Sequence, residues 1–237
     1  MEKKYKLSKE TFTMNSGKPL DVNFVIMHRV IALKDFGDVK KGDIGGFIEK
    51  ESNLSQEGNC WIYDDATICG EAKIYGNAQV RNNAHIDGFA SIYDNAKIYD
   101  YADINGHSLI YDEAEVHDHS SVCGLANVFE NAKIYGNSNI FGEANVYGNA
   151  NINNTEICSN AQINVDLSNN DNYIVISPVG YRNDTITFIK NDKGIHVNAF
   201  IYSGSLYRFK QKCLEALDPY KDTEKYMKII NNIQKIL

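Results

Sequence analysis

The sequence predicts a mainly β fold in which the middle of the chain coils into a triangular parallel β-helix. An N-terminal β cap and a C-terminal α+β module flank it. Three observations predict this fold: Ile or Val recurs at every sixth residue of the middle, outward aromatic residues recur at every eighteenth, and both ends of the chain lose these periods. A period of six fits neither an α-helix nor a hairpin meander, and it is a known β-helix period.

The repeat has three positions with distinct physical roles. Sixteen consecutive hexads place the aliphatic residue at Ile62, Ile68, Ile74, Val80, Ile86, Ile92, Ile98, Ile104, Ile110, Val116, Val122, Val128, Ile134, Ile140, Val146 and Ile152. β-branched residues suit a buried strand. Ala, Ser or Cys stands two positions earlier, which lets the chain turn a tight corner. Gly, Asp, Asn or once Glu stands two positions later, where the corner needs a left-handed backbone.

An eighteen-residue period indicates three hexads per coil, and hence three faces. After the aliphatic residue, the first face presents Tyr75, Tyr93, Tyr111, Phe129 and Tyr147. The second face presents Tyr63, Arg81, Tyr99, His117, Tyr135 and Asn153, and the third presents Cys69, Asp87, Asn105, Cys123 and Phe141. The hexads amount to about five triangular coils, a prism roughly 25 Å tall at strand spacing. One outward aromatic ladder should run along its first face.

The tandem unit A-x-[IV]-x-[GDN]-x, over residues 60–163, resembles the left-handed parallel β-helix of the hexapeptide-repeat superfamily. That superfamily is known for its acyltransferases, although one fold hosts many functions. The resemblance implies left-handed coils. After Ile152 the phase slips by one residue, to Ile157 and Ile163, so we expect the last coil to loosen.

The flanking segments should cap the prism, because an open β-helix end would expose a strand edge. We expect a β cap in residues 1–51, the β-helix in residues 52–167 and a β3α2 module in residues 168–237. The C-terminal strands are predicted at Tyr173–Ser177, Thr185–Lys190 and Gly194–Tyr202, after a polar linker at 168–172. One helix should begin at Ser203 and a second after Asp218.

Two flanking segments resemble phage and prophage hexapeptide-repeat proteins of Gram-positive bacteria: the entry from Ala32 to Ile62 and the motif from Arg182 to Phe188. The resemblance implies a phage-borne accessory protein acting in the host cytoplasm. We therefore expect a non-enzymatic binding protein that inhibits anti-phage defence, through an immune protein or a nucleotide messenger. The alternative is a hexapeptide-repeat acyltransferase, and a third possibility is a structural virion or scaffold component.

His117 is the candidate base for the acyltransferase alternative. The resemblance implies a histidine in a groove between the prisms of a trimer, often beside a loop that leaves a coil. His117 lies between Tyr99 and Tyr135 on the second face, but no loop interrupts the hexads from Ile62 to Ile152. This favours the non-enzymatic hypothesis. We expect neither a metal nor a cofactor, since His117 and His119 should diverge around a corner and zinc needs three or four converging ligands.

The outward aromatic side chains predict an interface or a ligand platform. A ladder of five such residues is a larger apolar patch than a monomer usually exposes. We expect a homo-oligomer, a trimer before a dimer, with the ladder in its seam or stacking against a ligand. Arg81, between Tyr63 and Tyr99, is the candidate phosphate clamp, with a cation–π surface contact as the alternative.

Charge and composition exclude two classes of partner. Residues 51–167 hold 4 Lys or Arg against 17 Asp or Glu, which should repel duplex nucleic acid. No apolar run approaches the roughly 18 residues of a membrane span. The five cysteines form no CxxC pair, so they indicate free thiols in a reducing cytoplasm.

Overall fold

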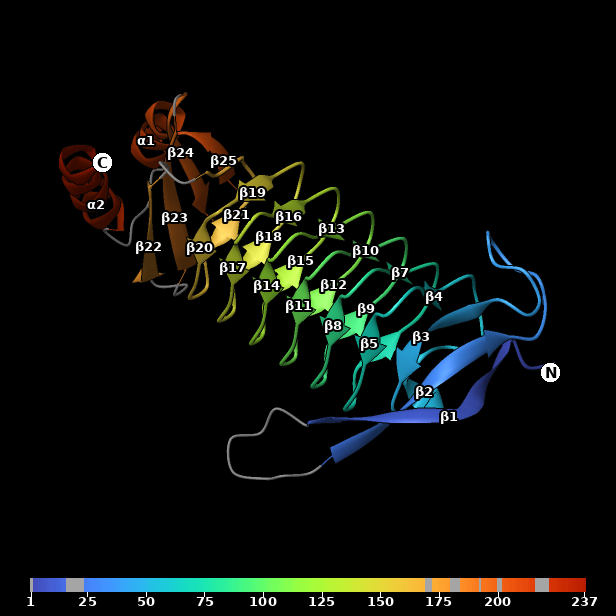
Figure 1. Ribbon diagram of the computed structural model, residues 1–237. Coiled ribbons are helices and arrows are strands. Elements are labelled where there is room, and N and C mark those ends of the chain that lie inside the picture. The colour runs from blue at the N-terminus through green and yellow to red at the C-terminus, as the bar shows by residue number, and fades with distance from the viewer. Residues whose placement is uncertain are drawn as a thin grey trace.

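The computed structural model describes residues 2–15, 24–168, 172–179, 184–191, 193–199, 202–215 and 222–237. Figure 1 shows three parts in a row: an N-terminal antiparallel hairpin, a prism of stacked coils, and a C-terminal sheet that carries two helices. The mainly β fold and the parallel β-helix are confirmed. Neither described helix is long and apolar enough to cross a membrane.

The N-terminal cap is one sheet with the third face of the prism. β1 (Tyr5–Asn15) and β2 (Phe24–Ala32) pair antiparallel. β3 (Ile44–Ile48) pairs antiparallel with β2 on one side and parallel with the first coil strand of that face on the other. A short 3-10 helix, Glu51–Asn53, leads into the coils. The cap therefore covers the strand edge that the first coil would expose, and it includes β1, which the sequence patterns did not predict.

Each face of the prism holds six short parallel strands from the coils. The first face has β6 (Lys73–Ile74), β9 (Ser91–Ile92), β12 (Leu109–Ile110), β15 (Asn127–Val128), β18 (Asn145–Val146) and β21 (Gln162–Ile163). The second has β4 (Trp61–Ile62), β7 (Gln79–Val80), β10 (Lys97–Ile98), β13 (Glu115–Val116), β16 (Lys133–Tyr135) and β19 (Asn151–Asn153). The third has β5 (Thr67–Ile68), β8 (His85–Ile86), β11 (Asp103–Ile104), β14 (Ser121–Val122), β17 (Asn139–Ile140) and β20 (Glu156–Ile157). The prism thus has about six turns, one more than predicted, because regular pairing continues beyond Ile152.

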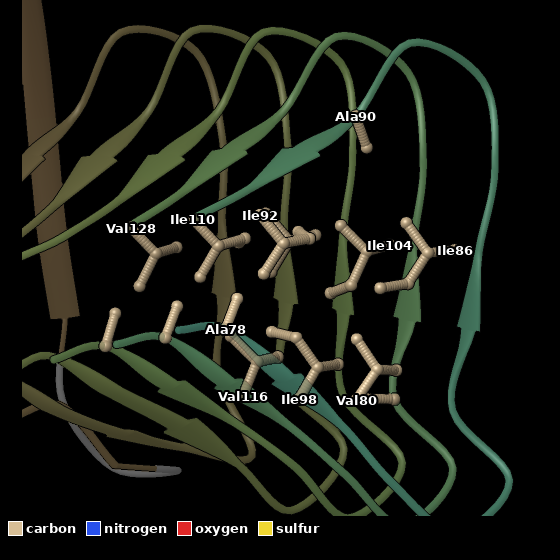
Figure 2. Close-up of a cluster of buried hydrophobic side chains, with 14 of the residues drawn as sticks. Ala78, Val80, Ile86, Ala90, Ile92, Ile98, Ile104, Ile110, Val116 and Val128 are labelled. Atoms are coloured by element: carbon tan, nitrogen blue, oxygen red, sulfur yellow. The ribbon is translucent and has the colours of Figure 1, made fainter. Parts of the chain in front are cut away.

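The predicted aliphatic and small positions form one continuous core. Figure 2 shows side chains from all three faces meeting inside the prism. The labelled aliphatic residues are fully buried: Val80, Ile86, Ile92, Ile98, Ile104, Ile110, Val116 and Val128. Burying a side chain of this size contributes about 1.5–3 kcal/mol. Because inward and outward side chains alternate along a strand, the residues flanking each aliphatic one point to the outside.

The corners explain why Asp, Asn and Gly follow each strand. Asn82, Asp100 and Asp118 have φ values of 58–59°, a left-handed conformation that Asn and Asp tolerate better than most residues. Their side chains also link the coils: Asp118 Oδ2 accepts the N–H of Gly136 at 2.9 Å, and Asp64 Oδ2 accepts that of Asn82 at 3.0 Å. A different corner holds only glycine over five coils: Gly70, Gly88, Gly106, Gly124 and Gly142.

The last coil is shorter by one residue but remains paired. Ile140 pairs with Ile157 and Val146 with Ile163, an offset of 17 residues instead of 18. The missing residue is absorbed at the corner around Asn154, which keeps a left-handed φ of 48°. The strands of this coil on the third and first faces do not loosen as expected, because a corner can lose a residue without breaking the strands beside it. On the second face the coil does loosen, since only an isolated bridge remains there, between Ile152 and Leu167.

The C-terminal module has four described strands rather than three. They are β22 (Asn172–Val179), β23 (Asp184–Asn191), β24 (Gly194–Ala199) and β25 (Tyr202–Ser205), in antiparallel order. The predicted third strand ends at Ala199, and its last predicted residue, Tyr202, begins β25, which pairs antiparallel with β24 so that Ala199 lies opposite Tyr202. α1 consequently begins at Leu206 (Leu206–Glu215), not at Ser203, and α2 spans Asp222–Ile236. Most of the predicted linker, Arg182 and Asp218 lie outside the described residues.

Candidate functional site

The second face carries a column of outward side chains that stack from coil to coil: Tyr63, Arg81, Tyr99, His117 and Tyr135. The His117 ring lies 4.6 Å from Tyr99 and 5.4 Å from Tyr135, and all three rings are nearly parallel. Parallel strands repeat at about 4.8 Å, so identical positions on successive coils place rings face to face. The predicted neighbourhood of His117 is confirmed.

His117 is held at one nitrogen and open at the other. Its Nδ1 lies 3.3 Å from Asp118 Oδ1, and its side chain is 19% exposed. The backbone N–H of Gly136 and the His117 ring hold the pKa of the Asp118 carboxyl below its usual range. Among the described residues, none forms a hydrogen bond to His117 Nε2. An imidazole fixed at Nδ1 by a carboxylate and open at Nε2 is equipped to accept a proton.

A charged row runs beside this column on the same strands. Glu115 lies between Lys97 and Lys133, at 3.2 and 3.1 Å, and its side chain is 19% exposed. Burial opposes the charge, but hydrogen bonds from Lys133 and Lys97 outweigh it and lower the pKa of Glu115. Three of the four Lys and Arg residues in 51–167 lie on the second face. The second face is therefore the basic face of an acidic prism.

Arg81 is committed to contacts within the chain. Its guanidinium lies 3.6 Å from the Tyr63 ring centroid, and Nη2 lies 3.3 Å from Asp38 Oδ2 and 2.9 Å from Gln79 Oε1. Tyr63 also donates its hydroxyl to Asp38, at 2.5 Å. Burial, followed by this hydrogen bond, raises the pKa of Tyr63. The structure thus shows the cation–π contact, while the role of Arg81 as a phosphate clamp stays a prediction.

The aromatic ladder of the first face is present as predicted. Tyr75, Tyr93, Tyr111, Phe129 and Tyr147 stack with centroid separations of 4.8, 5.0, 5.1 and 5.3 Å. Burial and the flanking tyrosines raise the pKa of Tyr93 to about 12. A row of amides follows the ladder at the next corner, where Asn77 donates to Asn95 at 3.0 Å. What covers the ladder in an assembly stays a prediction.

A second histidine–carboxylate group lies on the third face, and the sequence analysis missed it. His85 Nε2 lies 3.9 Å from Asp87 Oδ2, with the buried Cys69 beside them. Burial, then Asp87 and Glu49, raise the pKa of the Cys69 thiol to about 12. A reactive cysteine needs a lowered pKa and a positive surrounding, so Cys69 is not placed as a nucleophile. The signal was available, because residues 16 and 18 apart lie on adjacent coils.

The predicted divergence of His117 and His119 agrees with their contacts, since His119 stacks on Tyr101 at the corner. His117 instead groups with Asp100 and Asp118, their potential ligand atoms within 4.8 Å of one another. Both carboxylates already accept a backbone N–H from the next coil, at 3.4 Å for Asp100 and 2.9 Å for Asp118. The two carboxylates therefore belong to the row of corner side chains that link successive coils, with His117 beside them, rather than to a metal site.

The repeat, the β-solenoid and one curated relative fit the hexapeptide-repeat β-helix superfamily. No family model matches the chain. The chain is 40% identical over 81 residues to the "Uncharacterized acetyltransferase YdcK" of Escherichia coli (strain K12). The match takes in 31% of this chain and 25% of that protein, so the chain spans about a quarter of the length of the relative it matches.

This comparison corrects the expected function. We predicted a non-enzymatic phage inhibitor of bacterial defence, and that prediction is wrong: the relative is named as an acetyltransferase, which points to the acyltransferase alternative. It also lends no support to the phage and prophage resemblance. The error came from treating the absence of a loop in the coils as evidence against catalysis. A flat face that holds a partly exposed histidine–carboxylate pair needs no such loop to supply a base.

Proposed function

We propose that the chain is an acyltransferase that moves an acetyl-class group from a thioester donor to a nucleophilic acceptor, with His117 as the general base. The observation that carries the proposal is the setting of His117, stacked between two tyrosines, paired to Asp118 at Nδ1 and open at Nε2. The E. coli relative, which is named as an acetyltransferase, supports the reaction class.

The chemistry needs one group that takes and returns a proton. His117 Nε2 removes the proton from an acceptor hydroxyl or amine, and the acceptor lone pair attacks the thioester carbonyl carbon. The tetrahedral intermediate collapses as the carbon–sulfur bond breaks, and the thiolate leaving group takes the proton back from His117. Asp118 and the faces of Tyr99 and Tyr135 stabilise the transient imidazolium. The net reaction turns acyl thioester and acceptor into acylated acceptor and free thiol.

The charge of the second face suits a thioester donor that carries phosphate. Lys97 and Lys133 lie on the coils before and after Glu115, two residues from His117 in the sequence of that coil, and both contact the single carboxylate of Glu115. A net positive row on an otherwise acidic prism attracts an anionic donor to this face rather than to the others. The stacked rings beside it offer a surface for a planar group.

The single chain leaves His117 on an open face and leaves the aromatic ladder of the first face partly exposed. The second face is a flat sheet, and coils without excursion loops build no wall around His117. We propose a homo-oligomer, a trimer before a dimer, in which the aromatic ladder of the first face lies in the seam. Its support is the ladder of five stacked rings, of which Tyr75 is 39% exposed in the single chain.

The test is acetyl transfer from acetyl-coenzyme A to a panel of primary amines and sugar hydroxyls, followed with radiolabelled donor. His117→Asn should lower turnover by roughly 100-fold or more. His107→Asn is the matched control, since His107 also stacks on an aromatic ring, Phe89 at 4.6 Å, but has no carboxylate partner among the ion pairs of the described residues. Equal turnover in the His117 variant and the wild type would overturn the proposal.

A further inference from the structure

The third face is the acidic face of the prism. None of its outward positions in the described coils holds Lys or Arg, whereas Asp87, Asp103 and Glu156 point out from its strands. Glu49 extends the same row at the cap end and accepts the N–H of Gly70 at 2.6 Å. Among the described residues, Asp87 has no ion-pair partner other than His85. Asp87 and Asp103 therefore lie on adjacent coils of a face whose outward positions in the described coils hold no Lys or Arg.

Three side chains of different chemistry converge in this acidic surrounding. Cys69 follows β5, and His85 and Asp87 flank the inward Ile86 on β8, the next strand of the same face (Figures 1 and 2). The Cys69 sulfur, a ring nitrogen of His85 and a carboxylate oxygen of Asp87 lie within 4.8 Å of one another. Cys69 is 7% exposed, and the side chains of His85 and Asp87 are 33% and 35% exposed. The group is thus buried at the sulfur and open to solvent at the other two.

The orientation of His85 is fixed by a fourth residue. Thr67 Oγ1 lies 2.8 Å from His85 Nδ1, so the threonine hydroxyl holds one ring nitrogen while Nε2 faces Asp87 at 3.9 Å. A histidine that ligates a metal almost always donates its other ring N–H to an outer partner, which fixes the tautomer. Thr67 lies directly below His85 on the preceding coil, at the paired position of β5.

We propose that Cys69, His85 and Asp87 form a binding site for a divalent transition metal of the zinc class, with Thr67 as the outer residue that positions His85. The metal replaces the thiol proton: Cys69–SH and M²⁺ give a Cys69–S–M⁺ thiolate complex and a released H⁺. Sulfur, imidazole and carboxylate are the three ligand types that zinc takes in proteins. The fourth tetrahedral position faces solvent and takes a water molecule.

The geometry suits zinc better than calcium or magnesium. Those cations prefer six or more oxygen ligands, and this group supplies one sulfur and one nitrogen among three donors. Zinc–ligand bonds of about 2.0–2.3 Å require donor separations of roughly 3.3–3.8 Å. Closing separations of at most 4.8 Å to that range takes side-chain shifts of about 1 Å, which the partly exposed side chains of His85 and Asp87 can make. The site lies on a different face from His117, so the metal proposal and the proposed acyl transfer are tested independently of each other.

Cobalt(II) is the probe, because a thiolate ligand gives it a near-ultraviolet charge-transfer band and tetrahedral geometry gives it intense visible bands. The full chain, stripped with a chelator and kept reduced, is titrated with Co²⁺ and then with Zn²⁺. We expect both sets of bands to saturate at one equivalent and to disappear when Zn²⁺ displaces the cobalt. Thr67→Val should weaken binding by roughly 10–100-fold, the usual effect of losing an outer partner.

The chain supplies a matched control for the thiol. Cys123 occupies the same outward position as Cys69, three coils further on, but the coil after it has Asn139 and Phe141 at the positions of His85 and Asp87. Cys69→Ser should abolish the charge-transfer band and Cys123→Ser should leave it unchanged. If Cys69→Ser fails to fold, His85→Gln, at a partly exposed side chain, should remove the tetrahedral bands. Absence of a charge-transfer band at one equivalent, its survival in the folded Cys69 variant, or survival of the tetrahedral bands in the folded His85 variant would overturn the proposal.

Discussion

Alanine substitutions at Gly106 and Gly148 should separate two energetic costs of a corner in this prism: the left-handed backbone conformation and the contact between successive coils. Gly106 has a φ of 70°, and a Cβ there would lie 2.7 Å from both the nitrogen and the oxygen of Gly124 on the next coil. Gly148 has nearly the same φ, 71°, but a Cβ there would meet no atom closer than 3.4 Å. Gly148→Ala therefore measures the cost of backbone conformation alone, and Gly106→Ala adds the clash between coils.

The magnitudes follow from the two geometries. Left-handed backbone costs a non-glycine residue roughly 1–2 kcal/mol, and the reduced freedom of the unfolded chain returns about 0.4–1 kcal/mol. Gly148→Ala should thus lower the free energy of unfolding by about 1 kcal/mol. At Gly106 the next coil must also retreat by about 0.7 Å to reach ordinary contact. This would weaken the bond from His107 N–H to Gly124 O, now 2.7 Å, at a further cost of about 1–2 kcal/mol.

Urea unfolding followed by far-ultraviolet circular dichroism measures both variants, with the free energies obtained by linear extrapolation. Fluorescence of Trp61, the single tryptophan, reports separately on the first coil, where it is buried. Gly106→Ala should be the less stable variant by about 1–2 kcal/mol. Equal losses at the two positions would refute the inference that the glycine corner is closed by contact between successive coils.

Two further predictions concern the outer faces. Glu115→Gln should destabilise the protein at neutral pH, because Lys97 and Lys133 lose their shared carboxylate. The folded pKa of Glu115 lies below the ordinary 4.5, so its contribution is complete above that value and is lost as the pH falls through the folded pKa. The stability difference in urea unfolding should close as the pH falls below the folded pKa of Glu115, and a constant difference would contradict it. Tyr93→Glu combined with Tyr111→Glu should give monomers of unchanged circular dichroism, and an unchanged mass in light scattering would refute the seam.

Residues that obey the period could be predicted in detail. Each aliphatic position proved to be buried, and the stack of His117 between Tyr99 and Tyr135 followed directly from the eighteen-residue spacing. The reason is that parallel strands in strict register place residues eighteen apart at the spacing between neighbouring strands. A separation in the sequence therefore predicts a distance between side chains. The glycine and Asp or Asn positions were predictable for the same reason, as corners with left-handed backbone.

Contacts that leave this register could not be predicted. Asp38 reaches Arg81 from a loop of the cap, 43 residues away, and no period relates the two. The separation of β24 from β25 could not be predicted either, because the residues from Gly194 to Tyr202 have the pattern of one continuous strand. The group of Cys69, His85 and Asp87 falls between these cases. Cys69 and Asp87 share a predicted row of residues that follow the aliphatic position. His85 precedes the aliphatic position on its strand, and no row was predicted there.

The seventeen-residue coil near Asn154 shows what changes of length such a chain can accept. It shifts only strands beyond the last stacked ring of the second face, so every ladder before it keeps its register. A segment of eighteen residues inserted among the coils would lengthen all three faces and leave each row continuous. A segment of six would also fold, yet it would move every later row to the neighbouring face and separate His117 from Tyr99. The fold can therefore accept insertions of one hexad, but the outward rows stay continuous only when the insertion is one whole coil of eighteen residues.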